Sequence, residues 1–387
     1  MPYEFDEIIN RRNTNSLKWD VGKNELPMWV ADMDFRTAPE IREAIEKRAA
    51  HGVFGYSVIP EEWQQAYVDW WSRRHHFQME KEWLIFCTGV VPAISSTIRK
   101  LTTPAEKVVV MTPVYNIFFN SIYNNGRNIL GNELVYDENG YHIDFDDLEK
   151  KLADPQTSLL IFCNPQNPGG KIWDRETMEK VGELCDQYHV LVISDEIHCD
   201  LTDPGKEYVP FASVSEKCRK NCIMCISPTK SFNLAGIQTA AVAVPNPEIR
   251  HKVWRALNTD EVAEPNAFAI EAAIAAFNKG EGWLDALRSY IFENKTTVIK
   301  CINEHIPQLK VVPSDATYLL WIDCSGLGNN APWTAEKIRE KTGLYLSAGE
   351  QYGKGGRDFL RMNIACPKSI IMEGLERLKE GVSTIEM

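Results

Sequence analysis

From about residue 84 onward, short runs of consecutive apolar residues alternate with stretches of helical pattern. The apolar runs are typical of strands that are buried on both faces of a sheet. Between two of them, the stretch ETMEKVGELCDQYH, which ends at His189, has the pattern of a helix. This alternation predicts an α/β fold in which helices cover both faces of a mostly parallel sheet. The expected strands are LIFC from Leu84, VVVM from Val108, SLLIFC from Ser158, VLVIS from Val190 and CIMCIS from Cys222.

The last hundred residues have a different pattern, which predicts a smaller α+β domain that the first forty-odd residues complete. We therefore expect a large domain at 46–281 and a small domain at 1–45 and 282–387. The elements expected in the C-terminal part are a long helix from Gly282 to His305, strands at 318–323 and 359–364, and a closing helix from near Pro367.

Charge and composition narrow the classes of function. The chain has 42 basic and 54 acidic residues, a formal net charge of -12 and a pI of about 5.3. This balance disfavours non-specific binding to nucleic acid and to anionic membranes. No stretch approaches the roughly 18 apolar residues that indicate a membrane span, and the N-terminal segment is too polar for a secretory signal. We expect a cytoplasmic protein.

The ten cysteines do not suggest a disulfide framework in a chain of this length. Cys218, Cys222 and Cys225 have a C-x3-C-x2-C spacing that can hold an iron–sulfur cluster. However, Cys222 and Cys225 lie in an apolar run that predicts a buried strand, in which alternate side chains face opposite sides. We interpret these cysteines as core residues and expect no metal.

Four of the expected strands end in polar or glycine-rich segments. In open α/β sheets, ligands bind beyond the carboxyl ends of the strands, so these segments are expected to converge on one crevice. They are CTGVVPA after the strand at Leu84, CNPQNPGGK after that at Ser158, SDEIHCD after that at Val190, and SPTKSFNLAG after that at Cys222.

Lys230 and Asp195 are the sharpest candidates for chemistry at these strand ends. Taken alone, Lys230 could be a solvated surface lysine, and Asp195 could cap the next helix. A lysine in a crevice can also lose its proton and form a Schiff base. A buried aspartate needs a cation, which a protonated pyridine nitrogen would supply. The pair therefore favours a pyridoxal 5′-phosphate site.

The phosphate of such a cofactor needs a binding site of its own. Gly89, Val90 and Val91 begin a predicted helix, whose free backbone N–H groups and dipole favour an anion. Ser227 could add a hydroxyl group. A Thr-Gly helix start is weak evidence by itself, because glycine opens many helices for steric reasons.

In their order and spacing, NPQNPGG, SDEIH and SPTKSFNLAG resemble the pyridoxal-phosphate-dependent class I/II aminotransferase superfamily of fold type I. Within it, the chain is most similar to the MalY/PatB branch of cystathionine β-lyases and to cystalysin-like C–S lyases. The likeness runs from LPMWVADMDF near Leu26 to FLRMNIACPKS, which ends at Ser369. It implies a seven-stranded, mostly parallel sheet in the large domain, and a homodimer with shared active sites.

The resemblance also implies a role for individual residues. Lys230 would form the Schiff base and move protons, Asp195 would pair with the pyridine nitrogen, and Tyr115 would stack on the ring. Arg361 would bind the substrate α-carboxylate, and Tyr56 would reach the cofactor phosphate of the neighbouring subunit. The implied cofactor contacts are Gly89, Val90, Val91, Tyr115, Asn167, Asp195, His198, Ser227, Lys230 and Tyr56, and the implied substrate contacts are Arg361, Tyr56, Asn167 and Ala31.

Without the resemblance, Arg361 could form a surface ion pair, Tyr115 could be a core residue, and Asn167 and Tyr56 could be turn residues. Two positions depart from the wider superfamily. Gln238 stands where many aminotransferases have a phosphate-binding arginine, and His198 stands where many have tyrosine. The C–S lyase branch also tends to lack that arginine, and its absence predicts looser cofactor binding.

The cofactor motifs serve β-elimination and transamination equally. WVADMDF, HGVFGYS and Gln238 favour the lyase, which would convert cystathionine or related cysteine S-conjugates to a thiol, pyruvate and ammonia. A PLP-dependent aminotransferase is the alternative. Because a branch member binds a transcription activator, a protein-binding regulator is a third hypothesis, for which the sequence marks no surface.

Overall fold

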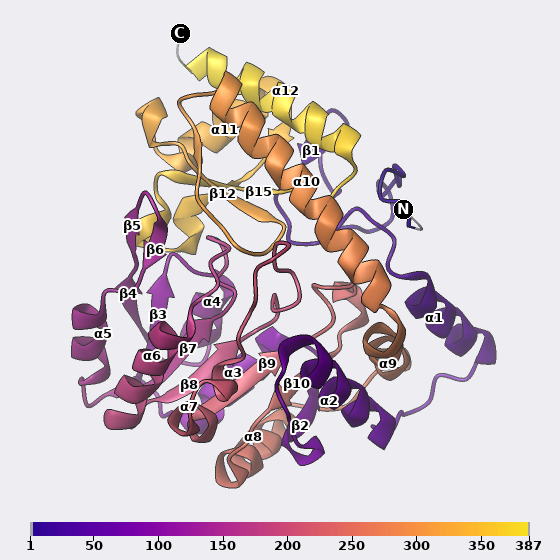
Figure 1. Cartoon of the computed structure of the whole chain (residues 1–387), viewed down its shortest axis with the longest axis vertical. Helices are drawn as coiled ribbons and strands as arrows, with labels where there is room; N and C mark the ends of the chain where they lie inside the picture. The colour runs from indigo at the N-terminus through magenta and orange to yellow at the C-terminus, as the bar shows by residue number, and fades with distance from the viewer. Residues whose placement is uncertain (1–2, 386–387) are drawn as a thin grey trace.

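The computed structural model describes residues 3–385 and is built around one seven-stranded sheet (Figure 1). β10 runs antiparallel to both of its neighbours, and the other pairs in the sheet are parallel. The five strands expected from the apolar runs are all present, and the α/β prediction is confirmed. The strand order is β2 (Leu84–Cys87), β10 (Ala240–Ala243), β9 (Cys222–Ile226), β8 (Leu191–Asp195), β7 (Thr157–Cys163), β3 (Lys107–Thr112) and β4 (Asn128–Glu133).

Helices cover both faces of this sheet, and each face has its own hydrophobic core. Side chains alternate along each strand, so Val108 and Val110 pack in one core and Val109 in the other. The first core contains residues of α3 (Val90–Leu101), α4 (Ile117–Tyr123) and α8 (Pro247–Thr259). The second contains residues of α2 (Glu61–His75), α6 (Arg175–Gln187) and α9 (Ala269–Lys279).

The same alternation separates two of the cysteines that have a cluster-like spacing. Cys222 packs in the core of α2 and α6, whereas Cys225 packs in the core of α3 and α8. Both side chains are fully buried in β9. The two thiols therefore face opposite sides of the sheet.

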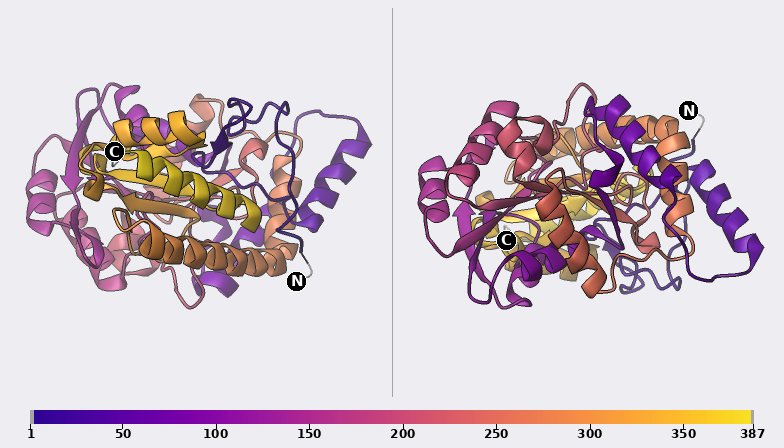
Figure 2. Two further views of the ribbon diagram at one scale, coloured as in Figure 1. Left: turned by 90° about the horizontal axis from the view of Figure 1, so that it is seen from above. Right: turned by 90° about the horizontal axis from the view of Figure 1, so that it is seen from below.

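A second, smaller layer contains the C-terminal third of the chain. Its four-stranded sheet has the order β11 (Lys310–Val311), β12 (Leu319–Asp323), β15 (Phe359–Asn363) and β14 (Ser347–Ala348). The long helix α10 (Glu281–His305) and the closing helix α12 (Lys368–Ile385) lie side by side on it, as Figure 2 shows from above. The N-terminal segment joins this layer, because β1 (Leu26–Pro27) pairs with β13 (Leu344–Tyr345). The domain boundaries at 45/46 and 281/282 stay predictions; α1 (Pro39–His51) spans the first of them.

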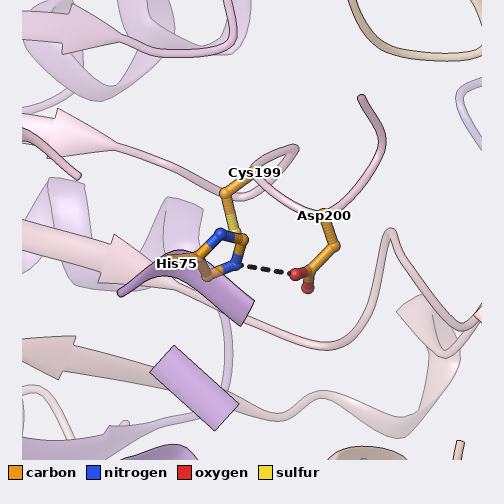
Figure 3. A group of neighbouring side chains, drawn as sticks. All are labelled: His75, Cys199 and Asp200. Carbon is orange, nitrogen blue, oxygen red and sulfur yellow. Dashed lines mark hydrogen bonds and ion pairs between the residues drawn. The ribbon is translucent and has the colours of Figure 1, made fainter. Parts of the chain in front are cut away.

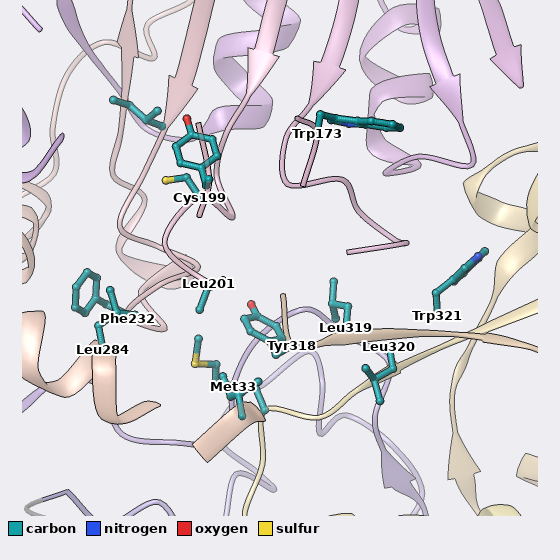
Figure 4. Packing of buried hydrophobic residues seen from close by; sticks show 14 of the residues in the cluster. Met33, Trp173, Cys199, Leu201, Phe232, Leu284, Tyr318, Leu319, Leu320 and Trp321 are labelled. Carbon is teal, nitrogen blue, oxygen red and sulfur yellow. The ribbon is translucent and has the colours of Figure 1, made fainter. Parts of the chain in front are cut away.

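Buried side chains join the two layers below the strand ends (Figure 4). Met33, Leu201, Phe232, Leu284 and Tyr318 all belong to one core cluster, although they come from distant segments. This contact fixes the N-terminal segment and α10 against the loops that follow β8 and β9. Within residues 3–385, no helix is long and apolar enough to cross a membrane.

Candidate active site

Three neighbouring parallel strands carry the polar segments expected at the site. Cys163 at the end of β7 pairs with Asp195 at the end of β8, which pairs in turn with Cys225 of β9. The segments that follow these strands therefore begin at the same edge of the sheet. Asn167 follows β7, and Lys230 lies in the turn after β9. The fourth expected segment follows β2, which lies beyond β10 and runs parallel to β9, so the expected convergence of strand ends is present in the fold.

Asp195 is a buried carboxylate in need of a positive partner. Burial raises its pKa to about 7, against the opposing effects of the Ile197 N–H and the positive charge of Lys230. The Ile197 N–H donates to its Oδ1 at 3.1 Å. A buried carboxylate keeps its charge only when donors or cations compensate it, so this position suits a cationic ring nitrogen.

Lys230 lies within electrostatic reach of Asp195. Its Nζ donates a hydrogen bond to the Ala31 carbonyl oxygen at 2.6 Å. Desolvation, assisted by the positive charge of Arg361, lowers the pKa of the amine to about 8, while Asp32 and Asp195 work in the opposite direction. A substantial fraction of the amine is therefore neutral near pH 8, as a nucleophile or base requires.

Arg361 lies in β15, in the middle of the smaller sheet, and its side chain is held from several directions. It donates to Asn167 Oδ1 at 3.2 Å and to the Trp29 carbonyl oxygen at 2.9 Å. Its guanidinium carbon lies 4.8 Å from the centre of the Tyr352 ring. Its buried Nε has no hydrogen-bond partner among residues 3–385. The guanidinium group thus keeps donor capacity for a carboxylate.

Tyr115 and His198 lie within electrostatic reach of the same group. Burial raises the pKa of the half-buried Tyr115 to about 12. Burial also lowers the pKa of His198 to about 3, with further effects from Lys230 and Arg361, so the imidazole is neutral. Its buried Nδ1 lacks a partner in the part of the chain that the structure describes. Both side chains can therefore contact a neutral or aromatic ligand.

The expected phosphate-binding segment forms the start of a helix. Gly89 is the N-cap of α3, and Val90 and Val91 are its first two residues. The Ser227 hydroxyl contacts Thr229 Oγ1 and the Thr239 carbonyl oxygen, each at 2.7 Å. Backbone N–H groups in the first turn of a helix are free for an anion.

Two residues identified from the sequence, Tyr56 and Gln238, lie at the surface of the chain. Tyr56 is fully exposed in the segment between α1 and α2. Gln238 is exposed and has a left-handed φ of 57°. Neither side chain has a hydrogen bond within residues 3–385, so the structure of the single chain does not bring Tyr56 to the Lys230 group.

The motifs did not identify two residues that complete this group, Tyr318 and Asn363. Tyr318 donates to the Ala31 carbonyl oxygen at 3.1 Å. Asn363 Nδ2 donates to the Asp32 carbonyl oxygen at 2.6 Å. Tyr318 begins one predicted strand, and Asn363 lies near the end of another and within the FLRMNIACPKS motif, but no role could be assigned to either residue from the sequence.

The residues present fit pyridoxal 5′-phosphate. The buried Asp195 needs a cation, and the amine of Lys230 has a lowered pKa. The buried His198 Nδ1, Arg361 Nε and Thr239 Oγ1 lack partners within the described chain. Buried polar atoms are normally paired, so these atoms are suited to a polar ligand. Together, fold and site define a PLP-dependent enzyme of fold type I.

Comparisons with known proteins give the family. The sequence profile of "Aminotransferase class I and II" matches residues 23–378. The chain is 40% identical to the cystathionine beta-lyase PatB of Bacillus subtilis, over 98% of this chain and 100% of the relative. It is also similar to cystalysin from Treponema denticola, a structure that contains pyridoxal 5′-phosphate, with 33% identity, a TM-score of 0.96, and 99% and 100% of the two chains covered.

A PLP-bound putative aminotransferase from Clostridium difficile gives a TM-score of 0.95 at 38% identity, over 98% of this chain and 100% of that one. The chain belongs to the class I and II aminotransferase family, and it is a PLP-dependent enzyme. The resemblance and the cofactor expected from the motifs are confirmed.

Proposed function

We propose that this enzyme is a carbon–sulfur β-lyase that cleaves L-cystathionine or related cysteine S-conjugates to a thiol, pyruvate and ammonia. One observation carries the proposal: Lys230, Asp195 and Arg361 lie together in a chain that is 40% identical, along its whole length, to a cystathionine beta-lyase. The similarity to cystalysin supports the same class of reaction.

The cofactor, when bound, supplies an electron sink for charge that develops at the substrate α-carbon. In this proposal Lys230 holds the cofactor and then, as a free amine, removes the α-proton. The lowered pKa of Lys230 supports that role, because a neutral amine is available near pH 8. The negative charge of Asp195 would keep the ring nitrogen protonated. The positive charge of the protonated nitrogen would in turn stabilise the buried carboxylate.

Arg361 orients the substrate by binding its α-carboxylate, with the guanidinium group fixed by Asn167 and the Trp29 carbonyl. We assign Asn167 and Tyr115 to contacts with the cofactor ring, and His198 to the same neighbourhood. Ala31 lies beside the substrate position, since its carbonyl accepts from Lys230. The phosphate is assigned to Gly89, Val90, Val91 and Ser227.

Transamination is the second candidate, because the same residues would serve it and a similar solved structure is described as a putative aminotransferase. The test supplies L-cystathionine to the holoenzyme and measures thiol and pyruvate. The proposal expects both products in equal amounts without an added 2-oxo acid. Turnover that requires a 2-oxo acid and releases no thiol would assign the enzyme to transamination instead.

We also propose a homodimer in which Tyr56 reaches the cofactor phosphate of the partner subunit. The segment that carries Tyr56 exposes Val53, Phe54, Val58 and Ile59 as well, an apolar surface suited to a second chain. Mixing subunits that carry Lys230→Ala with subunits that carry Tyr56→Ala tests this arrangement. Shared sites restore activity in the mixed dimer, whereas sites within one subunit leave it inactive.

The ten cysteines are all free thiols, and nine of them are buried. Free thiols persist in a reducing compartment, which supports our proposal that the enzyme acts in the cytoplasm. Titration of the purified protein with a thiol reagent under denaturing conditions should find ten reactive groups. A lower number that rises after reduction would contradict this assignment.

A further inference from the structure

A buried carboxylate that the proposed chemistry does not use lies close behind the site. Asp200 follows β8 by five residues, and its side chain is fully buried. Its Oδ1 accepts from Trp70 Nε1 and from His75 Nε2, both at 2.9 Å (Figure 3 shows the His75 contact). Its Oδ2 accepts from the Ser231 hydroxyl at 3.1 Å. Three donors from two distant segments, α2 and the turn after β9, therefore meet on one carboxylate.

The charge of Asp200 is compensated by these donors. Burial tends to raise the pKa of the carboxyl group, but the hydrogen bond and charge of His75, the Trp70 N–H and the charge of Arg74 hold it below its usual value. Asp200 is therefore an ionised anchor. Hydrogen bonds to an ionised group are stronger than those between neutral groups, so each donor is held firmly.

Ser231 directly follows Lys230 in the chain and is itself fully buried. The turn around it is closed by two backbone hydrogen bonds, from Phe232 N to Pro228 O at 2.9 Å and from Leu234 N to Thr229 O at 2.8 Å. The bond from Ser231 to Asp200 ties this turn to the segment that follows β8, the strand that ends at Asp195. The connection acts on the backbone of Lys230, not on its amine.

We propose that Asp200 is a positioning residue, which holds Ser231 and thereby fixes the turn that carries Lys230. The inference rests on the proposed role of Lys230 as the residue that holds the cofactor and moves the proton. A displacement of such a group by about 1 Å can lower the reaction rate strongly, while the contacts that bind the substrate elsewhere are retained. Arg361 lies on a different sheet. The binding of the substrate carboxylate by Arg361 should therefore not depend on the contact between Asp200 and Ser231.

The surroundings of Asp200 also suggest an alternative, a binding site for a metal cation. Ligand atoms of His75, Cys199 and Asp200 lie within 4.8 Å of one another and line a cavity of about 590 Å³. Two observations favour the hydrogen-bonded arrangement. Both carboxylate oxygens of Asp200 already accept hydrogen bonds, from Trp70 Nε1 and from the Ser231 hydroxyl. Burial also raises the pKa of the Cys199 thiol well above its usual value, so the thiol stays protonated.

The experiment compares the holoenzyme with Ser231→Ala, Asp200→Asn and the double variant. Ser213→Ala is the matched control, because the Ser213 hydroxyl likewise donates a hydrogen bond, to the Pro210 carbonyl oxygen, and lines the same cavity without contacting Asp200. The readouts are kcat and KM, the visible circular dichroism of the bound cofactor, and the rate at which hydroxylamine releases it. Mass spectrometry of the parent first identifies the lysine that holds the cofactor. A lysine other than Lys230 would contradict the proposed function itself, and this result is distinguishable from a failure of the Asp200 proposal.

We expect Ser231→Ala to lower kcat about tenfold, with KM changed less than about twofold, to alter the circular dichroism and to speed release by hydroxylamine. The double variant should be no worse than the worse single variant, because both changes break one contact. Ser213→Ala should match the parent. Should Asp200→Asn fail to fold, Ser231→Ala alone decides.

Parental kcat and circular dichroism in Ser231→Ala would overturn the proposal, as would strictly additive effects in the double variant. A third result would also overturn it: one zinc ion per chain in the purified parent, measured by elemental analysis and lost in Asp200→Asn. That result would make Asp200 a metal ligand.

Discussion

The amine of Lys230 and the carbonyl oxygen of Ala31 are joined by a hydrogen bond of 2.6 Å, although 199 residues separate them in the chain. The bond connects the turn after β9 with the N-terminal segment that lies against the smaller sheet. It gives a free amine at this position an acceptor, so the N-terminal segment takes part directly in the candidate site.

The lowered pKa of Lys230 predicts how the apoenzyme takes up its cofactor. Only the neutral amine attacks an aldehyde, and desolvation lowers the pKa of this amine to about 8. The rate at which visible absorbance appears after PLP is added should therefore rise with pH and level off above about 8. Stopped-flow measurements from pH 6 to about 10 test this expectation. A rate that still rises steeply at pH 10, as it would for a lysine with the ordinary pKa of 10.5, would contradict it.

Asp195→Asn should make the apoenzyme more stable at neutral pH while it abolishes activity. The pKa of Asp195 is raised in the folded apoenzyme, to about 7, so the folded state binds more protons than the unfolded state between about pH 4 and 7. The stability of the parent therefore falls as the pH rises through that window. Asparagine cannot ionise, so the unfolding free energy of Asp195→Asn does not fall with pH for this reason.

Urea unfolding of the two apoenzymes at pH 4 and pH 8 measures this effect. The Asp195→Asn advantage in unfolding free energy should be near zero at the lower pH and on the order of 3 kcal/mol at the higher one. Equal advantages at both values would show that the carboxyl group is not desolvated as described.

Arg361→Lys should raise KM about 10- to 100-fold and change kcat much less. Lysine keeps the charge but lacks the planar fork that matches a carboxylate, and it cannot hold Asn167 and the Trp29 carbonyl together. Steady-state kinetics with L-cystathionine give both constants. Arg339→Lys, at the half-exposed pair with Glu25, is the control and should leave KM unchanged. An unchanged KM in Arg361→Lys would remove this residue from substrate binding.

Asn233→Ala should loosen the N-terminal segment. The Asn233 side chain accepts from Met33 N and donates to the carbonyl oxygens of Met33 and Phe35 at 3.0 and 2.9 Å. Its removal leaves these backbone groups without a partner, at a cost of about 1–3 kcal/mol in unfolding free energy. Asn258→Ala removes one exposed bond and should cost less than about 0.5 kcal/mol. Equal losses in the two variants, measured in urea, would contradict the anchoring role.

The core of the sheet could be predicted because its strands are continuous apolar runs. β10 was missed, since its sequence AAVA is short and alanine has a low preference for strands. β4, at the edge of the sheet, was missed because NILGNE is largely polar. The long helix α10 and the strands β12 and β15 were found from their patterns.

The site divides in a similar way. Lys230 and Asp195 could be predicted because Asp195 ends one buried strand and Lys230 follows another, and parallel strands end at one edge of a sheet. The contacts of Ala31, Tyr318 and Asn363 could not, because they depend on how the smaller layer packs on the larger one. Asn363, for example, donates to a carbonyl oxygen 331 residues away.

The most direct measurement identifies the lysine that carries the cofactor. The holoenzyme is reduced with borohydride, digested, and its peptides are analysed by mass spectrometry, with Lys230→Ala as the comparison. The account predicts one modified peptide, with the added mass at Lys230, and no visible cofactor absorbance in Lys230→Ala. Added mass at another lysine of the parent, or parental absorbance in the variant, would contradict it.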